Sequence, residues 1–359
     1  MINNRIYLVG SLYTLINAVN LEASLTNKNS SKAYLVFFGT LSGFHRSLYD
    51  NVKNSLFHGV YLENHPNKSN KLVNLFKLIF KKYKTNKIHI REKDSTEIFS
   101  QNLIFTLLGP FNRTKFCQYH YLEEGLSTYT DFNHRFENRN FWIKMINKFI
   151  YGDQLIPKFK YVYIYNQSLY NGIMETKTLP KFDVSLFKKS ENEEIQKENF
   201  PDRMFLGSPI ESIDSLLAKN LRGNKKNIFQ LYVSEKLEGV YSILNGENFL
   251  YKTHPNEVLN GIHNRFEIYH TNLPWELNIN SCEDSNILIS VFSTAAITPK
   301  ILYNKEPRVI FLFRLLQPYL FFQAEEFLAR VRNSYQNKDR VVAPRTIKEL
   351  SEILSKFSQ

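Results

Sequence analysis

The chain has 359 residues but only two cysteines, Cys117 and Cys282. A scaffold built on disulfides is therefore excluded, and so few thiols favour a reducing compartment. Apolar residues are not scarce, because hydrophobic residues make up 43% of the chain and aromatic residues 14%. This composition excludes a disordered chain, a collagen-like chain and a coiled-coil rod. At roughly 150 residues per domain, the length predicts two domains.

Long apolar runs are also missing. The most apolar stretch near the N-terminus, residues 6–21, is interrupted by Ser11, Asn17 and Asn20, whereas a membrane-spanning helix needs about 20 apolar residues. The same stretch has neither the basic start nor the small-residue cleavage site of a signal peptide. We therefore expect a cytoplasmic protein, whose contact with the plasma membrane, if it has one, is peripheral and on the inner face.

Acidic residues are in the minority, with 34 Asp and Glu against 46 Lys and Arg and a formal net charge of +12. Such a charge fits nucleic acid, an anionic membrane face or a phosphorylated small molecule, or serves solubility alone. Lysines interleave with apolar residues over residues 68–87, which is typical of a basic amphipathic helix. That helix could lie on a membrane or form the solvated back of an α/β domain. Because no helix-turn-helix, RRM or zinc signature is present, nucleic acid is not the expected partner.

Apolar strand-like runs alternate with helical patterns along the whole chain. In the first half, strands are expected at residues 5–10, 33–38, 87–90, 102–107 and 116–122, with a helix at 15–24. In the second half, strands are expected at 204–209, 228–233, 248–253, 266–269, 287–292 and 308–313, with helices at 235–244, 319–332 and 346–357. This alternation predicts two α/β halves, each with a parallel sheet and helices on both faces.

A charged stretch separates the two halves. Residues 190–199, SENEEIQKEN, are nearly free of apolar side chains and indicate a linker. We expect a first domain at residues 1–185, a linker at 186–203, a second domain at 204–335 and a C-terminal helix within 336–359 that could pack back on the first domain. A cleft between two such domains is a favoured place for ligands.

The triplet Glu123-Glu124-Gly125 follows one of the predicted strands. In a parallel sheet, ligands bind beyond the carboxyl ends of the strands. A carboxylate there can act as a general base, because burial or repulsion from its neighbour raises its pKa. Gly125 allows a sharp turn and a close approach of substrate. Taken alone, such a triplet is more often an ordinary charged loop after a strand.

His254-Pro255 follows another predicted strand. The proline favours an extended backbone at His254, and an imidazole there can contact a phosphate or protonate a leaving group. The pair His65-Pro66 in a polar stretch shows that the dipeptide alone is weak.

Three further motifs also follow predicted strands. Ser293-Thr294 could open a helix as an anion site or simply cap it. Glu276 could accept both hydroxyls of a ribose or sit near a helix start. The turn at Gly207-Ser208 offers backbone amides to a ligand, or is only a turn.

The order of these motifs, EEG, LGSP, HP, PWE and ST, resembles that of bacterial sialyltransferases that share a D/E-D/E-G motif, an HP motif and a Ser-Ser/Thr motif. Within them the chain is most similar to glycosyltransferase family 52, the lipooligosaccharide and capsule sialyltransferases. Residues 289–298 look like that family's phosphate-binding strand and helix, and residues 204–209 like its first strand of the second domain. Residues 5–21, with Tyr13 and Thr14, look like its opening strand and acceptor-side loop.

The resemblance implies a GT-B fold, with two Rossmann-like domains and an active site in the cleft between them. It implies CMP-N-acetylneuraminic acid as donor, inversion at the anomeric carbon and no metal or other cofactor. It implies catalytic roles for Glu123 or Glu124 as base and for His254 as acid. It also implies two sets of binding residues: Gly207, Ser208, His254, Pro255, Glu276, Ser293 and Thr294 for the donor, and Tyr13, Thr14 and Gly125 on the acceptor side.

The sequence departs from the family at Ile210, where some members carry an aspartate that has been assigned as the base. This departure shifts the expected base to Glu123 or Glu124. The resemblance implies α2,3 transfer to a terminal galactose of a bacterial surface glycan, and a homodimer. Another GT-B transferase, such as a polysialyltransferase or a CDP-alcohol polymer transferase, is the alternative. A basic protein that binds nucleic acid or a membrane surface is a more remote one.

Overall fold

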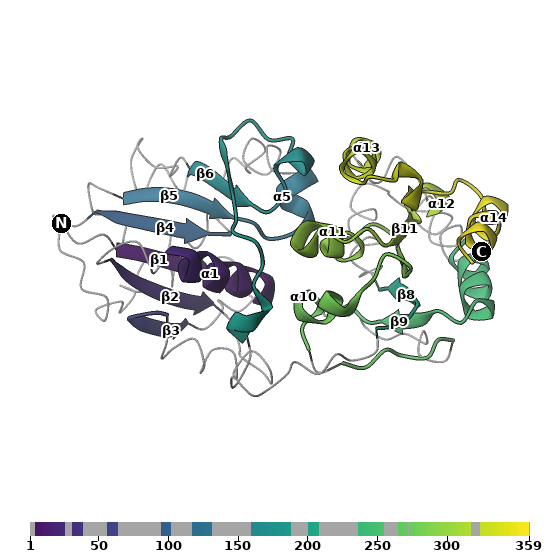
Figure 1. The fold of residues 1–359 in the computed structure, drawn as a ribbon, viewed down its shortest axis with the longest axis horizontal. Helices are drawn as coiled ribbons and strands as arrows, with labels where there is room; N and C mark the ends of the chain where they lie inside the picture. Colours follow the sequence, from purple (N-terminus) through teal and green to yellow (C-terminus); the bar gives the residue numbers. More distant parts are fainter. Residues whose placement is uncertain are drawn as a thin grey trace, which may run out of the picture. The chain divides into compact units, whose positions relative to one another are not determined.

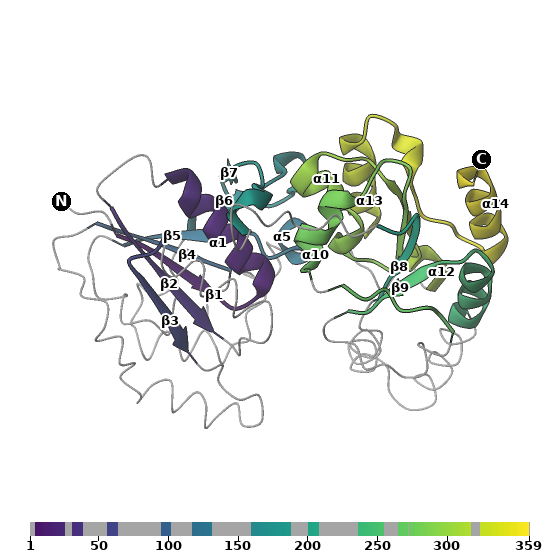
Figure 2. The ribbon, with the colours of Figure 1, turned by 60° about the horizontal axis from the view of Figure 1, so that its bottom comes forward.

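The structure is a computed structural model. It describes residues 4–25, 31–38, 56–63, 95–101, 117–130, 159–187, 200–207, 236–254, 265–271, 273–316 and 324–358. The chain divides into two compact units, Met1–Glu194 and Ile195–Gln359, and the division lies inside the stretch 186–203 that was expected to be a linker. Figures 1 and 2 show the helices and strands of the two units.

The first unit is built on a parallel sheet whose order is β3-β2-β1-β4-β5-β6-β7. Its strands are β1 Asn4–Val9, β2 Lys32–Phe38, β3 Gly59–Glu63, β4 Thr96–Ser100, β5 Cys117–Leu122, β6 Phe159–Ile164 and β7 Thr176–Thr178. This is the Rossmann order 3-2-1-4-5-6 with a further edge strand. The order reverses between β1 and β4, where such sheets open a crevice for ligands.

The long helix α1, Leu12–Leu25, lies against this sheet (Figure 1). A buried ion pair joins its Glu22 to Arg5 of β1. Glu22 accepts hydrogen bonds from Arg5 Nη2 at 2.6 Å and Nε at 2.8 Å, and from the Tyr7 hydroxyl at 2.8 Å. The hydrogen bond to Glu22 raises the pKa of Arg5. The bidentate geometry fixes the helix relative to β1.

The second unit is built on a smaller parallel sheet of order β12-β11-β10-β8-β9. Its strands are β8 Arg203–Leu206, β9 Leu250–Lys252, β10 Ile287–Ser290, β11 Arg308–Phe311 and β12 Val341–Val342. A parallel bridge from Tyr251 to Ile268 continues the sheet beyond β9. Counted with that bridge, the order is again 3-2-1-4-5-6, with its reversal between β8 and β10.

The remaining helices are short, apart from the helix at residues 236–246 and two near the C-terminus. The α-helices are α5 Leu126–Thr130, residues 236–246, α10 Trp275–Asn278, α11 Thr298–Tyr303, α12 Phe313–Leu316, α13 Ala324–Ser334 and α14 Ile347–Phe357. The 3₁₀ turns are η2 Gln167–Leu169, η3 Val184–Phe187, η5 Ile279–Ser281, η6 Thr294–Ala296 and η8 Lys338–Arg340. None of the described helices is long and apolar enough to cross a membrane.

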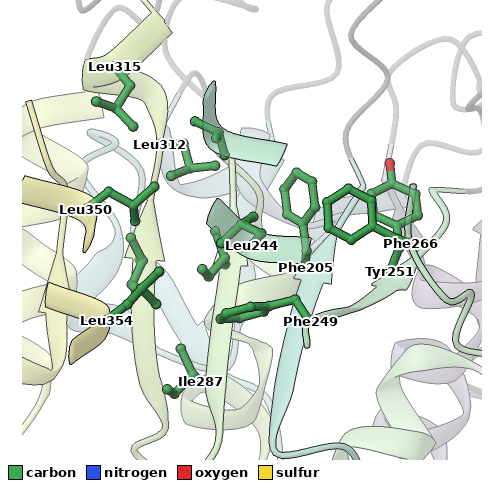
Figure 3. Close-up of a cluster of buried hydrophobic side chains, with 13 residues drawn as sticks. Phe205, Leu244, Phe249, Tyr251, Phe266, Ile287, Leu312, Leu315, Leu350 and Leu354 are labelled. Atoms are coloured by element: carbon green, nitrogen blue, oxygen red, sulfur yellow. The ribbon is translucent and has the colours of Figure 1, made fainter. Parts of the chain in front are cut away.

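The core of the second unit lies between its sheet and two of these helices (Figure 3). Leu244 of the helix at 236–246 and Leu350 and Leu354 of α14 pack with Phe205 and Ile287 of the sheet. The apolar face of α14 is therefore used by its own unit. The expectation that the C-terminal helix also packs back on the first domain stays a prediction.

The predicted α/β class with two Rossmann-like units is confirmed by the two strand orders. The strands expected at 5–10, 33–38, 116–122, 204–209, 248–253, 287–292 and 308–313 correspond to β1, β2, β5, β8, β9, β10 and β11. The strand expected at 266–269 is wrong, since only the bridge at Ile268 forms there. The strands expected at 87–90, 102–107 and 228–233, and the amphipathic helix at 68–87, lie outside the described residues.

Candidate active site

Glu123 is the centre of the polar cluster in the first unit. It follows β5 directly and is fully buried. Its Oε1 accepts a hydrogen bond from the Tyr13 hydroxyl at 2.5 Å. Its Oε2 accepts one from the Tyr129 hydroxyl at 2.5 Å and one from the backbone N–H of Tyr165 at 2.9 Å. Both carboxylate oxygens therefore have partners, and the distances to the hydroxyls are those of charge-assisted bonds.

Burial raises the pKa of Glu123 from 4.5 to about 7, although the hydrogen bonds from Tyr129, Tyr13 and Tyr165 act in the opposite direction. Burial also raises the pKa values of Tyr13 and Tyr129 well above 10, so both remain hydroxyl donors near neutral pH. A carboxylate with a pKa near the working pH is suited to general base catalysis.

The sheet order explains why these groups meet. Parallel pairing places the carboxyl ends of β1, β4, β5 and β6 at the same edge of the sheet. Gly125 has a φ of 107°, a left-handed conformation that glycine adopts without strain. The chain can therefore turn directly after Glu123, and Glu124 N donates to Thr128 Oγ1 at 3.0 Å in the short helix that follows.

Thr14 belongs to a second polar group at the point where the first sheet reverses. It is buried, and its hydroxyl donates to Gln101 Oε1. The same oxygen accepts from the backbone N–H of Gly10 at 3.3 Å. Gln101 was not predicted as a site residue. The signal for it was its place directly after β4, a strand that the sequence analysis did not recognise.

The second unit gathers its predicted donor-binding residues at the carboxyl edge of its own sheet. Gly207 follows β8, and its N–H donates to Lys252 O at 2.8 Å at the end of β9. His254 comes two residues after β9, and Ser293 three residues after β10. Because these strands are parallel and paired in register, all three residues lie beyond the same edge. Ser208 and Pro255 lie outside the described residues.

Ser293 and Thr294 open a 3₁₀ turn, η6. The Ser293 hydroxyl accepts from Ala295 N at 3.2 Å, and Thr294 O accepts from the Thr298 hydroxyl at 2.8 Å. The capping interpretation of this motif is therefore confirmed for Ser293. Binding of a phosphate by the same two residues stays a prediction.

Glu276 lies on α10, beside the same turn. The neighbouring Trp275 donates its indole N–H to Ala295 O at 3.0 Å, and Tyr303 donates its hydroxyl to Glu276 O at 2.8 Å. Burial raises the pKa of Glu276, and the charge of Lys252 opposes this rise. Burial likewise lowers the pKa of Lys252. Lys252, which the sequence analysis missed, thus supplies a cation at this edge and is the last residue of β9.

Among the described residues, no group of three or more His, Cys, Asp or Glu side chains could hold a metal ion. That the reaction needs no metal stays a prediction, as does a cleft between the units.

No protein-family model matches the chain, and no curated protein matches it. Among solved structures, it is similar to UDP-N-acetylglucosamine 2-epimerase from Rickettsia bellii, at 13% identity over 100% of this chain and 96% of that one, with a TM-score of 0.48. It is also similar to the GT-B domain of a sialyltransferase from Photobacterium damselae, at 13% identity over 95% and 99% of the two chains, with a TM-score of 0.48. MurG from Acinetobacter baumannii matches at 9% identity over 100% and 91%, with a TM-score of 0.41. All three TM-scores are below 0.5, so the class of fold, two consecutive Rossmann-like units, rests on the strand orders.

Proposed function

We propose that this chain is an inverting glycosyltransferase that moves N-acetylneuraminic acid from CMP-N-acetylneuraminic acid to a galactose-terminated acceptor. The observation that carries the proposal is Glu123, a buried carboxylate with a pKa of about 7 at the carboxyl edge of a Rossmann-like sheet. The motif order in the sequence supports the choice of donor. The two-unit α/β organisation supports transfer between two ligands bound by different units.

The chemistry asks for few groups. The anomeric carbon of sialic acid is a tertiary centre beside a carboxylate, so its transition state resembles an oxocarbenium ion. CMP leaves readily once the charge on its phosphate is stabilised. In the proposed arrangement His254 contacts that phosphate and gives it a proton, Ser293 and Thr294 donate hydrogen bonds to it, and Glu276 holds the ribose. The backbone of Gly207 faces the cytosine of CMP.

Between the two carboxylates of the EEG triplet, we assign the proton-accepting role to Glu123. It is the fully buried one of the pair, and two tyrosine hydroxyls and a backbone N–H fix its orientation. Glu124 is only partly buried. The position of the family aspartate, Ile210, lies outside the described residues.

The finer parts of the proposal follow from the resemblance alone. They are α2,3 linkage to galactose on lipooligosaccharide or capsule, independence from metal ions, a cytoplasmic location with peripheral contact to the membrane, and a homodimer. A polysialyltransferase or a CDP-alcohol polymer transferase would keep the fold and change the donor or the acceptor.

The test is release of CMP from CMP-N-acetylneuraminic acid with and without lactose, in buffer containing EDTA. We expect lactose to stimulate release by the wild type. We expect His254→Ala and Glu123→Gln each to lower it by about 100-fold or more, because general acid and base groups typically contribute 10²–10⁴-fold. His270→Ala, which removes an exposed histidine of the same unit, is the matched control and should keep full activity.

The proposal fails if no galactoside acceptor stimulates release and CMP does not raise the melting temperature. Turnover of a CDP-activated polyol in its place would favour the polymer transferase.

A further inference from the structure

The buried carboxylate at the centre of the first unit cannot be reached directly from outside. Glu123 has no exposed surface, and three donors among the described residues bond to its two oxygens. An acceptor hydroxyl could bond to it only by displacing one of them. The group that touches the acceptor is therefore to be sought among those donors.

The three donors differ in their chemistry and in how far each residue is buried. The backbone N–H of Tyr165 cannot exchange its proton during catalysis, because the amide is far too weak an acid. Tyr129 has a hydroxyl but is fully buried. Tyr13 has a hydroxyl and is half-buried as a residue, although its phenol is desolvated enough for burial to raise its pKa. It is the partner of Oε1, whereas the other two donors share Oε2, so Tyr13 is the hydroxyl donor with a route toward the surface.

We propose that Tyr13 is the catalytic residue that contacts the acceptor and that it relays the acceptor's proton to Glu123. This inference rests on the proposed glycosyl transfer and adds a step to it. The acceptor hydroxyl gives its proton to the Tyr13 oxygen while the Tyr13 proton passes to Glu123 Oε1. The acceptor oxygen bonds to the anomeric carbon, and the bond from that carbon to the phosphate oxygen breaks, with its electron pair leaving on CMP. After product release, Glu123 returns the proton to water through Tyr13.

The geometry suits such a relay. The Tyr13 hydroxyl donates directly to Oε1, so the two groups are within the hydrogen-bond reach that proton transfer needs. The carboxylate has a pKa of about 7, so it can accept a proton above neutral pH and release it again within a turnover. Tyr13 lies near the start of α1. The buried ion pair between Glu22, further along this helix, and Arg5 of β1 holds the helix in place.

Tyr129 provides a matched control, because it makes the same hydrogen bond to the other oxygen of the same carboxylate at the same distance. Each tyrosine lowers the pKa of Glu123 through its hydrogen bond. Both Tyr13→Phe and Tyr129→Phe should therefore move the acidic limb of the kcat/KM profile to higher pH. Only Tyr13→Phe breaks the relay, and it should lower kcat at the alkaline plateau by about 100-fold. Tyr129→Phe should stay within about tenfold of the wild type there.

The experiment compares the pH profiles of lactose-dependent CMP release for the wild type and the two phenylalanine variants. Their melting temperatures and their affinity for CMP are measured alongside. Equal plateau losses in the two variants, or a full plateau in Tyr13→Phe, would overturn the relay and leave the proposed function standing. If the wild type transfers no sialic acid to lactose, both the relay and the proposed function are wrong.

If Tyr13→Phe fails to fold, 3-fluorotyrosine at position 13 keeps the ring and hydroxyl and makes the phenol more acidic. The relay then predicts a change in the plateau kcat, and an unchanged plateau would overturn it.

Discussion

Replacing Glu123 by glutamine should make the protein more stable at alkaline pH. The folded-state pKa of Glu123 is raised from 4.5 to about 7. An acidic group whose pKa is higher in the folded than in the unfolded state contributes stability. That stability is fully present below the unfolded-state pKa and is lost as the pH rises through the folded-state pKa. One pKa unit corresponds to about 1.4 kcal/mol, so ionisation of Glu123 should cost about 3 kcal/mol between pH 4.5 and pH 8.

Glutamine can occupy the same place and keep a hydrogen-bond partner on its oxygen and on its nitrogen. Its oxygen can accept from Tyr129 and from Tyr165 N, and its amide can donate to the Tyr13 oxygen, since a phenol is both donor and acceptor. Urea unfolding at pH 5 and pH 8 should therefore show a fall in the free energy of unfolding that is about 2 to 3 kcal/mol larger for the wild type than for Glu123→Gln. Glu175→Gln, which replaces an exposed glutamate of the same unit, is the control. It should show the same fall in the free energy of unfolding between pH 5 and pH 8 as the wild type. If wild type and Glu123→Gln lose the same free energy between the two pH values, the burial argument is wrong.

Two further predictions concern the cores of the two units. Leu354→Ala removes a fully buried side chain between α14 and the second sheet and should lower the free energy of unfolding by about 2 to 5 kcal/mol. Lys356→Ala on the exposed side of the same helix should change it by less than about 0.5 kcal/mol in the same urea titration. Arg5→Met leaves the buried Glu22 without its cation and should destabilise the first unit by about 3 to 5 kcal/mol. Hydrogen exchange of β1 and α1 would show this, and unchanged protection there would contradict it.

The sequence predicted the strands whose apolar runs are flanked by turns. The run at residues 287–292 is an example, because every residue of it is apolar or small and the polar pair Ser293-Thr294 follows it. The strand Thr96–Ser100 was missed, since it has only five residues and begins with Thr and Glu after a charged stretch. Such a strand is specified by its two neighbours, β1 and β5, rather than by its own pattern.

The candidate site was predictable in part for a similar reason. Glu123 could be placed at a strand end because the apolar strand before it and the glycine after it are local signals. Its partners could not, since Tyr13 and Tyr165 are separated from it by 110 and 42 residues in the sequence. They reach Glu123 only because β1 and β6 end at the same edge as β5. Site chemistry that depends on strand order cannot be read from one segment at a time.

The burial that makes Glu123 a useful proton acceptor also makes its ionised form unfavourable. Ionisation is what the proposed base requires and what removes stability as the pH rises. A hydrogen bond from Tyr13 or Tyr129 lowers the pKa of Glu123. The same hydrogen bond therefore favours ionisation of the proposed base and reduces the stability that ionisation removes. The activity of the free enzyme should therefore be half-maximal near pH 7, and the loss of stability, which begins near pH 4.5, should level off near the same pH. Tyr129→Phe should move both of these pH values upward by the same amount. A shift in the activity midpoint without a matching shift in stability would mean that the group titrating in the rate profile is not Glu123.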